Sequence, residues 1–262
     1  MARLHPPPPG PPPLVAVAHG SRDPRSAATV AELVTQVRRR RPDLDVRLSF
    51  LDLSAPRLHD VLDGVYGQGH REAVVVPLLL GHAFHARVDV PGAVARAARR
   101  HPGLDLAVTA VLGGDPRPAD AALCRLADAA GPLDDPGLGV VLAAAGSSHA
   151  PANAAVAEIV AGWARRYGWK GGLAAFAAVA DPTVDAAVRT LHGAGRIAVA
   201  QWFLAPGLLP DRVAAAARGT DPTVAIAAPL GADPAVAELV LDRYAAAAAE
   251  LTDLRGQRRV AS

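Results

Sequence analysis

Apolar and polar positions follow two periods that succeed each other along the chain. Short apolar runs, typical of buried strands, precede segments in which apolar residues recur every three or four positions, typical of one buried helix face. The expected strands cover residues 14–19, 46–53, 73–81 and 106–113, and the expected helices lie around residues 30–41, 58–65, 91–100 and 117–130. This order predicts an α/β fold with a mostly parallel sheet covered by helices on both faces.

The same order starts again after "PLDDPG" (132–137), which we interpret as a linker. The next apolar run, "GVVLAAAGSS" (139–148), resembles "LVAVAHGSR" (14–22). One constant spacing aligns Gly20 with Gly146, Phe50 with Phe176, Pro56 with Pro182 and Gly69 with Gly195. Several matches in one register indicate an internal duplication of one α/β unit.

The duplication predicts how the chain is divided. We expect a disordered proline-rich tail over residues 1–13 and a first domain over residues 14–131. A second, degenerate repeat would cover residues 138–252, followed by a C-terminal tail over residues 253–262. Each domain would contain one mostly parallel sheet with helices on both faces.

The two halves differ at their histidines. His19 ends the first expected strand and aligns with Ala145, whereas His85 falls near Leu209. A histidine needed only for folding would tend to persist in both copies. In a parallel sheet the carboxyl ends of all strands meet at one edge, where ligands bind. We therefore expect His19 and His85 to meet at a functional edge of the first domain alone.

Two imidazoles at one edge favour metal or proton chemistry. Neutral histidines bind divalent metals and accept protons. Asp89 is interpreted either as a further ligand or as the N-cap of the next helix. Such ligands discriminate little between Fe²⁺, Co²⁺, Ni²⁺ and Zn²⁺. The sequence alone therefore leaves the metal open.

Residues beside the histidines favour binding of an anion. Ser21 directly precedes an expected helix, so it is interpreted either as a helix cap or as a substrate contact. Arg22, Arg25 and Arg87 can pair with carboxylates. These residues could therefore hold an anionic group.

Composition excludes several classes of protein. Lys and Arg number 27 against 25 Asp and Glu, so the net charge of +2 gives no nucleic-acid signature. Cys124 is the only cysteine, which excludes a disulfide within the chain. No apolar run reaches the roughly 18 residues of a membrane helix, and the N-terminus lacks a signal-peptide core. We expect a cytoplasmic protein that binds neither nucleic acid nor membrane.

Two motifs together carry a family resemblance. "HGSRDP" (19–24), followed by "VPLLLGHAFHARVDVP" (76–91), resembles the sirohydrochlorin chelatases, the class II tetrapyrrole chelatases. The resemblance implies insertion of a divalent metal, Fe²⁺, Co²⁺ or Ni²⁺, into sirohydrochlorin, with no other cofactor. It places the catalytic and metal-binding roles on His19 and His85. It further implies two domains facing each other across a pseudo-dimeric cleft, so we expect a monomer.

Substrate-binding residues are expected around these histidines: Ser21, Arg22, Arg87 and Asp89. The sequence departs from the family at Ala83, where glycine is common, and it adds His82 nearby. His82 and His149 are therefore left open as further members of the site.

Two other functions remain open at this point. The first is a non-catalytic carrier of metal or tetrapyrrole on the same fold. The second is a hydrolase that uses Ser21 and His19, although no Gly-x-Ser-x-Gly elbow is present. Among the metals we favour Fe²⁺ for siroheme over Co²⁺ for cobalamin.

Overall fold

The computed structural model describes residues 10–81 and 89–260. The chain forms two compact units. One unit comprises the chain up to Gly114 together with the segment from Pro234 onward, and the other comprises Asp115–Asp233. None of the helices within the described ranges is long and apolar enough to cross a membrane.

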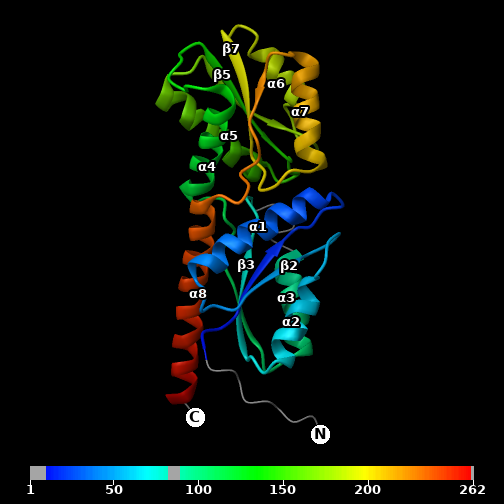
Figure 1. The fold of residues 1–262 in the computed structure, drawn as a ribbon, viewed down its shortest axis with the longest axis vertical. Coiled ribbons are helices and arrows are strands. Elements are labelled where there is room, and N and C mark those ends of the chain that lie inside the picture. Colours follow the sequence, from blue (N-terminus) through cyan, green and yellow to red (C-terminus); the bar gives the residue numbers. More distant parts are fainter. Residues whose placement is uncertain (1–9, 82–88, 261–262) are drawn as a thin grey trace. The chain divides into compact units, whose positions relative to one another are not determined.

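The first unit contains one parallel sheet with the strand order β2-β1-β3-β4. Figure 1 labels β2 and β3 of this sheet together with the helices of the unit. Its strands are β1 (Leu14–Ala18), β2 (Val46–Phe50), β3 (Glu72–Pro77) and β4 (Asp105–Val108). Its helices are α1 (Pro24–Arg40), α2 (Leu58–Gly67), α3 (Val90–Arg100) and α8 (Pro234–Val260). The predicted α/β class is confirmed.

Both faces of this sheet are covered, which explains its continuous apolar strands. All five residues of β1 are buried, as expected for a central strand between two helical layers. Val15 and Val17 pack with Leu62 of α2 and Val94 of α3 in one cluster. Helices α1 and α8 pack against each other, and α8 also contacts β3 and β4.

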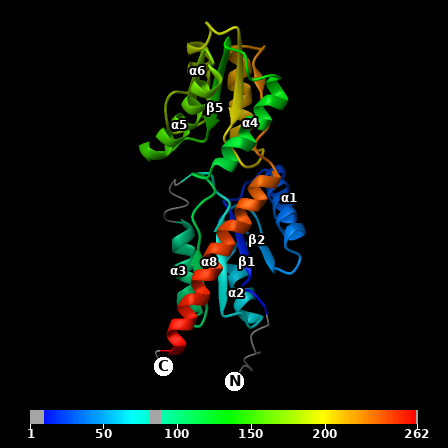
Figure 2. The same ribbon diagram turned by 90° about the vertical axis from the view of Figure 1, so that its left-hand side faces the viewer.

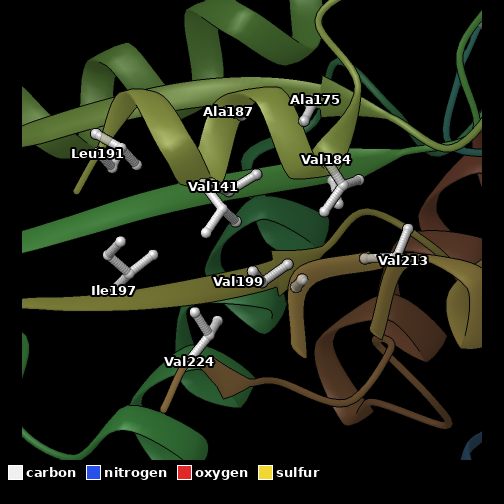
Figure 3. Packing of buried hydrophobic residues seen from close by; sticks show 12 residues of the cluster. Val141, Ala175, Val184, Ala187, Leu191, Ile197, Val199, Val213 and Val224 are labelled. Atoms are coloured by element: carbon white, nitrogen blue, oxygen red, sulfur yellow. The ribbon is translucent and has the colours of Figure 1, made fainter. Parts of the chain in front are cut away.

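The second unit repeats this sheet with the order β6-β5-β7-β8. Its strands are β5 (Leu138–Ala144), β6 (Gly171–Phe176), β7 (Arg196–Gln201) and β8 (Ala225–Ile226). Its helices are α4 (Pro116–Ala130), α5 (Ala150–Tyr167), α6 (Val184–Thr190) and α7 (Leu208–Thr220). Figure 3 shows the cluster in which Val141 and Val199 of the sheet pack with Val184 of α6 and Val213 of α7.

The two units exchange the helix that ends each repeat (Figure 2). Helix α4 follows β4 in the sequence but packs against β7 and β8. Helix α8 follows β8 but packs against β3, and its Tyr244 hydroxyl donates a 2.7 Å hydrogen bond to the Pro12 carbonyl. The compact units thus differ from the expected boundaries of 14–131 and 138–252. Both helices have a buried apolar stripe, and periodicity does not specify which sheet a stripe covers.

Two terminal segments also bear on the expected division. The expected tail over residues 253–262 is helical through Val260, because α8 continues into it. Of the expected proline-rich tail, residues 1–9 lie outside the described residues.

The strands end earlier than the apolar runs that predicted them. β2 ends at Phe50, β3 at Pro77 and β4 at Val108, although each apolar run continues. Leu78 and Leu112, just beyond these ends, are still buried. Hydrophobicity reports burial rather than ladder hydrogen bonding, so buried loops at the carboxyl edge extend the apparent strands.

The expected linker is a fixed connection between α4 and β5. The Arg196 side chain donates a 2.8 Å hydrogen bond to Asp135 and further bonds to the carbonyls of Ala130 and Pro132. The indole N–H of Trp169 donates a 2.6 Å bond to the Leu133 carbonyl. These contacts attach the segment to the second sheet.

Candidate active site

His19 lies at the carboxyl end of the central strand β1. In this sheet β1 is flanked by β2 and β3, so the connections leaving β1 and β3 run to opposite faces. Such a switch point is where open α/β sheets bind ligands. The Leu78 N–H donates a 2.8 Å bond to the Val17 carbonyl, which places the end of β3 directly beside this point.

The second predicted histidine follows β3 along the chain. His85, together with His82 and Arg87, lies outside the described residues. The connection from Pro77 to Val90 that contains it is longer than its counterpart from Gln201 to Leu208. The chain therefore carries more residues in this connection than in its counterpart in the second unit.

The turn after His19 requires glycine. Gly20 has φ +96°, and a Cβ placed there would lie 1.7 Å from the carbonyl oxygen of Asp52. The Asp52 N–H donates a 2.9 Å hydrogen bond to the His19 carbonyl. This close approach joins the histidine turn to the loop that follows β2.

A reciprocal pair of hydrogen bonds holds Ser21. Its N–H donates to the Ser54 hydroxyl at 3.1 Å, and that hydroxyl donates to the Ser21 carbonyl at 3.0 Å. The Ser21 hydroxyl accepts a 3.0 Å bond from the Asp23 N–H. The N-cap of α1 is Asp23, whose carboxylate accepts from the Arg25 N–H at 3.0 Å. Of the two interpretations of Ser21, its hydroxyl thus stabilises the turn before the helix, and the cap belongs to Asp23.

The charged residues of this edge differ in their partners. Arg25 pairs with Asp23, and Arg57 pairs with Asp52. Arg22 is exposed and forms no ion pair with any residue in the described ranges. Among these three arginines, Arg22 is the one whose guanidinium is available to an anionic ligand.

Asp52 is ionised beside the histidine turn. The hydrogen bond from the Leu53 N–H lowers the pKa of this carboxyl, as do the Arg57 guanidinium and the positive charge of a protonated His19. The Nδ1 atom of the His19 imidazole is buried from solvent.

Asp89 occupies the N-cap position of α3 without capping through its side chain. Its backbone is αR, and no side-chain hydrogen bond caps the helix. Within residues 10–81 and 89–260, no group of three or more His, Cys, Asp or Glu side chains is arranged to hold a metal ion.

The second unit repeats the turn without the histidine. Gly146 has φ +89°, and a Cβ there would lie 2.0 Å from the carbonyl oxygen of Ala178. The Ala178 N–H donates a 3.0 Å bond to the carbonyl of Ala145, the counterpart of His19. In the first unit the two hydrogen bonds between Ser21 and Ser54 form what we call the serine clasp. In the second unit Asn153 takes its place, accepting a hydrogen bond from the Ser147 N–H and donating one to the Ser147 carbonyl. His149 occupies the N-cap position of α5.

The loop over residues 51–56 was not predicted as part of the site. It supplies Asp52 and Ser54, which hold the turn, and exposes Leu53 beside it. The repeat carried a signal for this loop, because Phe50 and Pro56 align with Phe176 and Pro182 on either side of its counterpart.

These features define a tandem α/β protein in which one of two like units presents a histidine at its switch point. The chain belongs to the CbiX family, whose model matches residues 13–129 and again residues 139–247. The two matches confirm the internal repeat and the resemblance stated from the motifs.

Curated relatives include enzymes named for different metals. The chain is 25% identical over 205 residues to a sirohydrochlorin cobaltochelatase of Priestia megaterium, covering 75% of this chain and 65% of that protein. It is 28% identical over 196 residues to a sirohydrochlorin ferrochelatase of the same organism, covering 74% and 71%. A cobaltochelatase of Methanosarcina acetivorans is matched over 61% of its length at 29% identity, covering 30% of this chain. The chain thus spans about two thirds or less of the length of several relatives.

Solved structures share the tandem fold. SirB from Bacillus subtilis subspecies spizizenii, in complex with cobalt, superposes with a TM-score of 0.75 at 24% identity, covering 91% of this chain and 95% of that one. SirB from Bacillus subtilis with Fe³⁺ gives a TM-score of 0.77 at 23% identity, covering 93% and 98%. The two tandem chelatase-like domains predicted from the sequence are confirmed at the level of fold.

Proposed function

We propose that this chain is a sirohydrochlorin chelatase that inserts a divalent metal ion into the tetrapyrrole. The observation that carries the proposal is the position of His19 at the switch point of one unit only, while the same turn in the other unit presents Ala145. The names of the curated relatives support the substrate. Metal and sirohydrochlorin are the two substrates, and no other cofactor is proposed.

The proposed chemistry is a coupled transfer of metal and protons. Two pyrrole N–H protons leave the ring as the divalent metal binds its four nitrogens. His19 in its neutral form accepts one proton, and the ionised Asp52 stabilises the resulting imidazolium. His85 is proposed as the second acceptor. The two imidazoles hold the incoming metal first, and the nitrogen lone pairs released when the metal passes to the ring accept the two pyrrole protons.

Recognition of the acidic rim is proposed for residues around the turn. The exposed guanidinium of Arg22 would pair with a substrate carboxylate, and Arg87 is assigned the same role. The Ser21 hydroxyl retains its proton for donation while it accepts from the Asp23 N–H. Asp89, at the N-cap position of α3, is proposed as a further substrate contact.

Fe²⁺ for siroheme is proposed as the metal ahead of Co²⁺ for cobalamin. Imidazole ligands accept both ions, and the relatives named for cobalt and for iron match at 25% and 28% identity. The preferred metal is therefore to be identified by comparing the rates of metal insertion. Initial rates of insertion with Fe²⁺, Co²⁺ and Ni²⁺ under anaerobic conditions should rank Fe²⁺ first.

The test of the activity is an absorbance assay of sirohydrochlorin and metal with catalytic amounts of the protein. Turnover of many equivalents is expected, and His19→Ala and His85→Ala should each lower the rate about 100-fold or more. The midpoints of thermal unfolding should stay unchanged, and His192→Ala, at an exposed position outside the proposed site, serves as the control with a normal rate. A stoichiometric spectral change without turnover would instead identify a carrier, and full activity in His85→Ala would contradict the assigned site.

A further inference from the structure

A large apolar side chain is exposed beside the histidine turn in a backbone conformation that disfavours it. Leu53 has φ +61°, and 44% of its surface is exposed. Its counterpart in the second unit, Val179, has φ +66° and is 77% exposed. Glycine and asparagine adopt this left-handed conformation at low cost, whereas leucine and especially valine do not. Both positions therefore combine an unfavourable backbone conformation with an exposed apolar side chain.

The loop holds Leu53 in a defined place next to His19. The Leu53 N–H donates a 2.8 Å bond to the Asp52 carboxylate, and the Ser54 N–H donates a 2.7 Å bond to the Asp52 carbonyl. Asp52 is bonded to the His19 carbonyl, and the Ser54 hydroxyl to Ser21. Unfavourable backbone conformations that the surrounding structure fixes in this way cluster at ligand-binding sites.

We propose that the Leu53 side chain contacts the flat apolar face of the tetrapyrrole substrate, an inference that rests on the function proposed above. Charged residues belong to the same pair of joined loops: Asp52, which precedes Leu53, pairs with Arg57, and the exposed Arg22 follows Ser21, to which Ser54 is bonded. A ligand that is complementary to the apolar Leu53 and the nearby Arg22 combines an apolar surface with peripheral carboxylates, as a carboxylated macrocycle does. Burial of Leu53 against the ring supplies affinity, and Arg22 binds the rim.

The test compares Leu53→Asn with Leu53→Met in the full chain. Asparagine tolerates positive φ but removes the apolar contact, whereas methionine keeps an apolar side chain of similar size. Leu53→Asn should raise KM for sirohydrochlorin about 5- to 10-fold, as expected for the loss of a partly buried leucine contact, with kcat within 2-fold. Leu53→Met should change KM less than about 2-fold. Fluorescence titration with metal-free sirohydrochlorin should show the same order of affinities.

Thermal unfolding separates this role from a structural one. Leu53→Asn should unfold at the same or a higher temperature than the wild type, and Val179→Asn should also unfold no lower, because both relieve the same backbone conformation. A lowered midpoint with unchanged KM in Leu53→Asn would show that Leu53 packs within the protein and would overturn the contact. An active wild type with an unchanged Leu53→Asn variant would likewise overturn the contact alone. A wild type that neither binds nor converts sirohydrochlorin would overturn the proposed function as well.

Discussion

The backbone N–H of Asp52 donates a 2.9 Å hydrogen bond to the carbonyl of His19. Ala178 makes the equivalent bond to Ala145 in the second unit, at 3.0 Å. The backbone of this edge is therefore the same in both units, while the side chain presented by the turn is an imidazole in one and a methyl group in the other. The turn therefore belongs to the fold, and the two units differ in the residue that the turn presents, His19 in one and Ala145 in the other.

Replacement of Gly20 by alanine should disrupt the site through the backbone. The new Cβ would lie 1.7 Å from the Asp52 carbonyl oxygen in addition to the cost of positive φ. We expect the free energy of unfolding to fall by about 3 kcal/mol or more, as measured by urea denaturation. Gly114→Ala is the matched control, because φ is +91° and the space is open, so it should cost about 1 kcal/mol. Equal losses in the two variants would contradict the clash.

Removal of the Arg22 guanidinium should weaken substrate binding rather than folding. Arg22 is exposed and has no ion-pair partner within the described ranges, so Arg22→Ala should raise KM for sirohydrochlorin about 3- to 10-fold. Arg25→Ala is the control, since Arg25 is paired with Asp23, and its KM should stay within about 2-fold. High salt should reduce the difference between Arg22→Ala and the wild type. A KM that rises equally in both variants would argue for a general charge effect.

Loss of the serine clasp should affect both stability and activity. Ser54→Ala removes the partners of the Ser21 N–H and carbonyl and should cost about 1–2 kcal/mol of unfolding free energy. Asn153→Ala removes the corresponding bonds to Ser147 in the second unit and should cost a similar amount. The rate of metal insertion should fall in Ser54→Ala alone, because Ser54 holds the turn that carries His19. Equal rates of metal insertion in the two variants would show that the Ser21–Ser54 hydrogen bonds do not affect the activity.

A chain ended after Asp233 should lose the first unit and keep the second. It lacks α8, whose fully buried Val236, Leu239 and Val240 each contribute about 1.5–3 kcal/mol by burial. That total is comparable to the whole stability of a domain. Limited proteolysis should degrade the region up to Gly114 and leave Asp115–Asp233 protected. A protected first unit would show that α8 is dispensable.

Ionisation of the buried Tyr244 hydroxyl should lower the free energy of unfolding at alkaline pH. Burial raises its pKa to about 12, while its hydroxyl donates to the Pro12 carbonyl. Because the folded pKa exceeds the unfolded value near 10, this contribution is complete below about pH 10 and is lost as the pH rises toward 12. Tyr244→Phe should cost about 1 kcal/mol near neutral pH through the lost hydrogen bond and should show a smaller decline above pH 10. Parallel pH curves of the two proteins would contradict this assignment.

Much of the fold was accessible from the sequence because each unit is built from local periodicities. The apolar run over residues 14–19 became the buried strand β1, and the stripe of Val30, Leu33, Val34 and Val37 became the buried face of α1. The repeat could be read because glycine is required at positions 20 and 146 by the same close approach of a carbonyl. The position of His19 at the carboxyl edge of the sheet followed from the rule that parallel strands end together.

Other features depended on contacts between residues distant in the chain. The sequence did not indicate that Leu53 is exposed next to His19, because that proximity depends on hydrogen bonds of Asp52 and Ser54 across neighbouring loops. A contact close in the chain was not specified either: the sequence did not show that Arg25 pairs with Asp23 while Arg22 forms no ion pair within the described ranges.

The sequence by itself determined the α/β class, because local apolar periodicity specifies strands and helices. It also determined the duplication and the loss of the histidine from the second copy, because both follow from direct comparison of the two halves. Only the tertiary structure decided that α4 covers the second sheet and α8 the first. An apolar helix face specifies that a surface must be buried, but the hydrophobic effect is non-directional, and the choice between two similar sheets is made by packing over the whole unit.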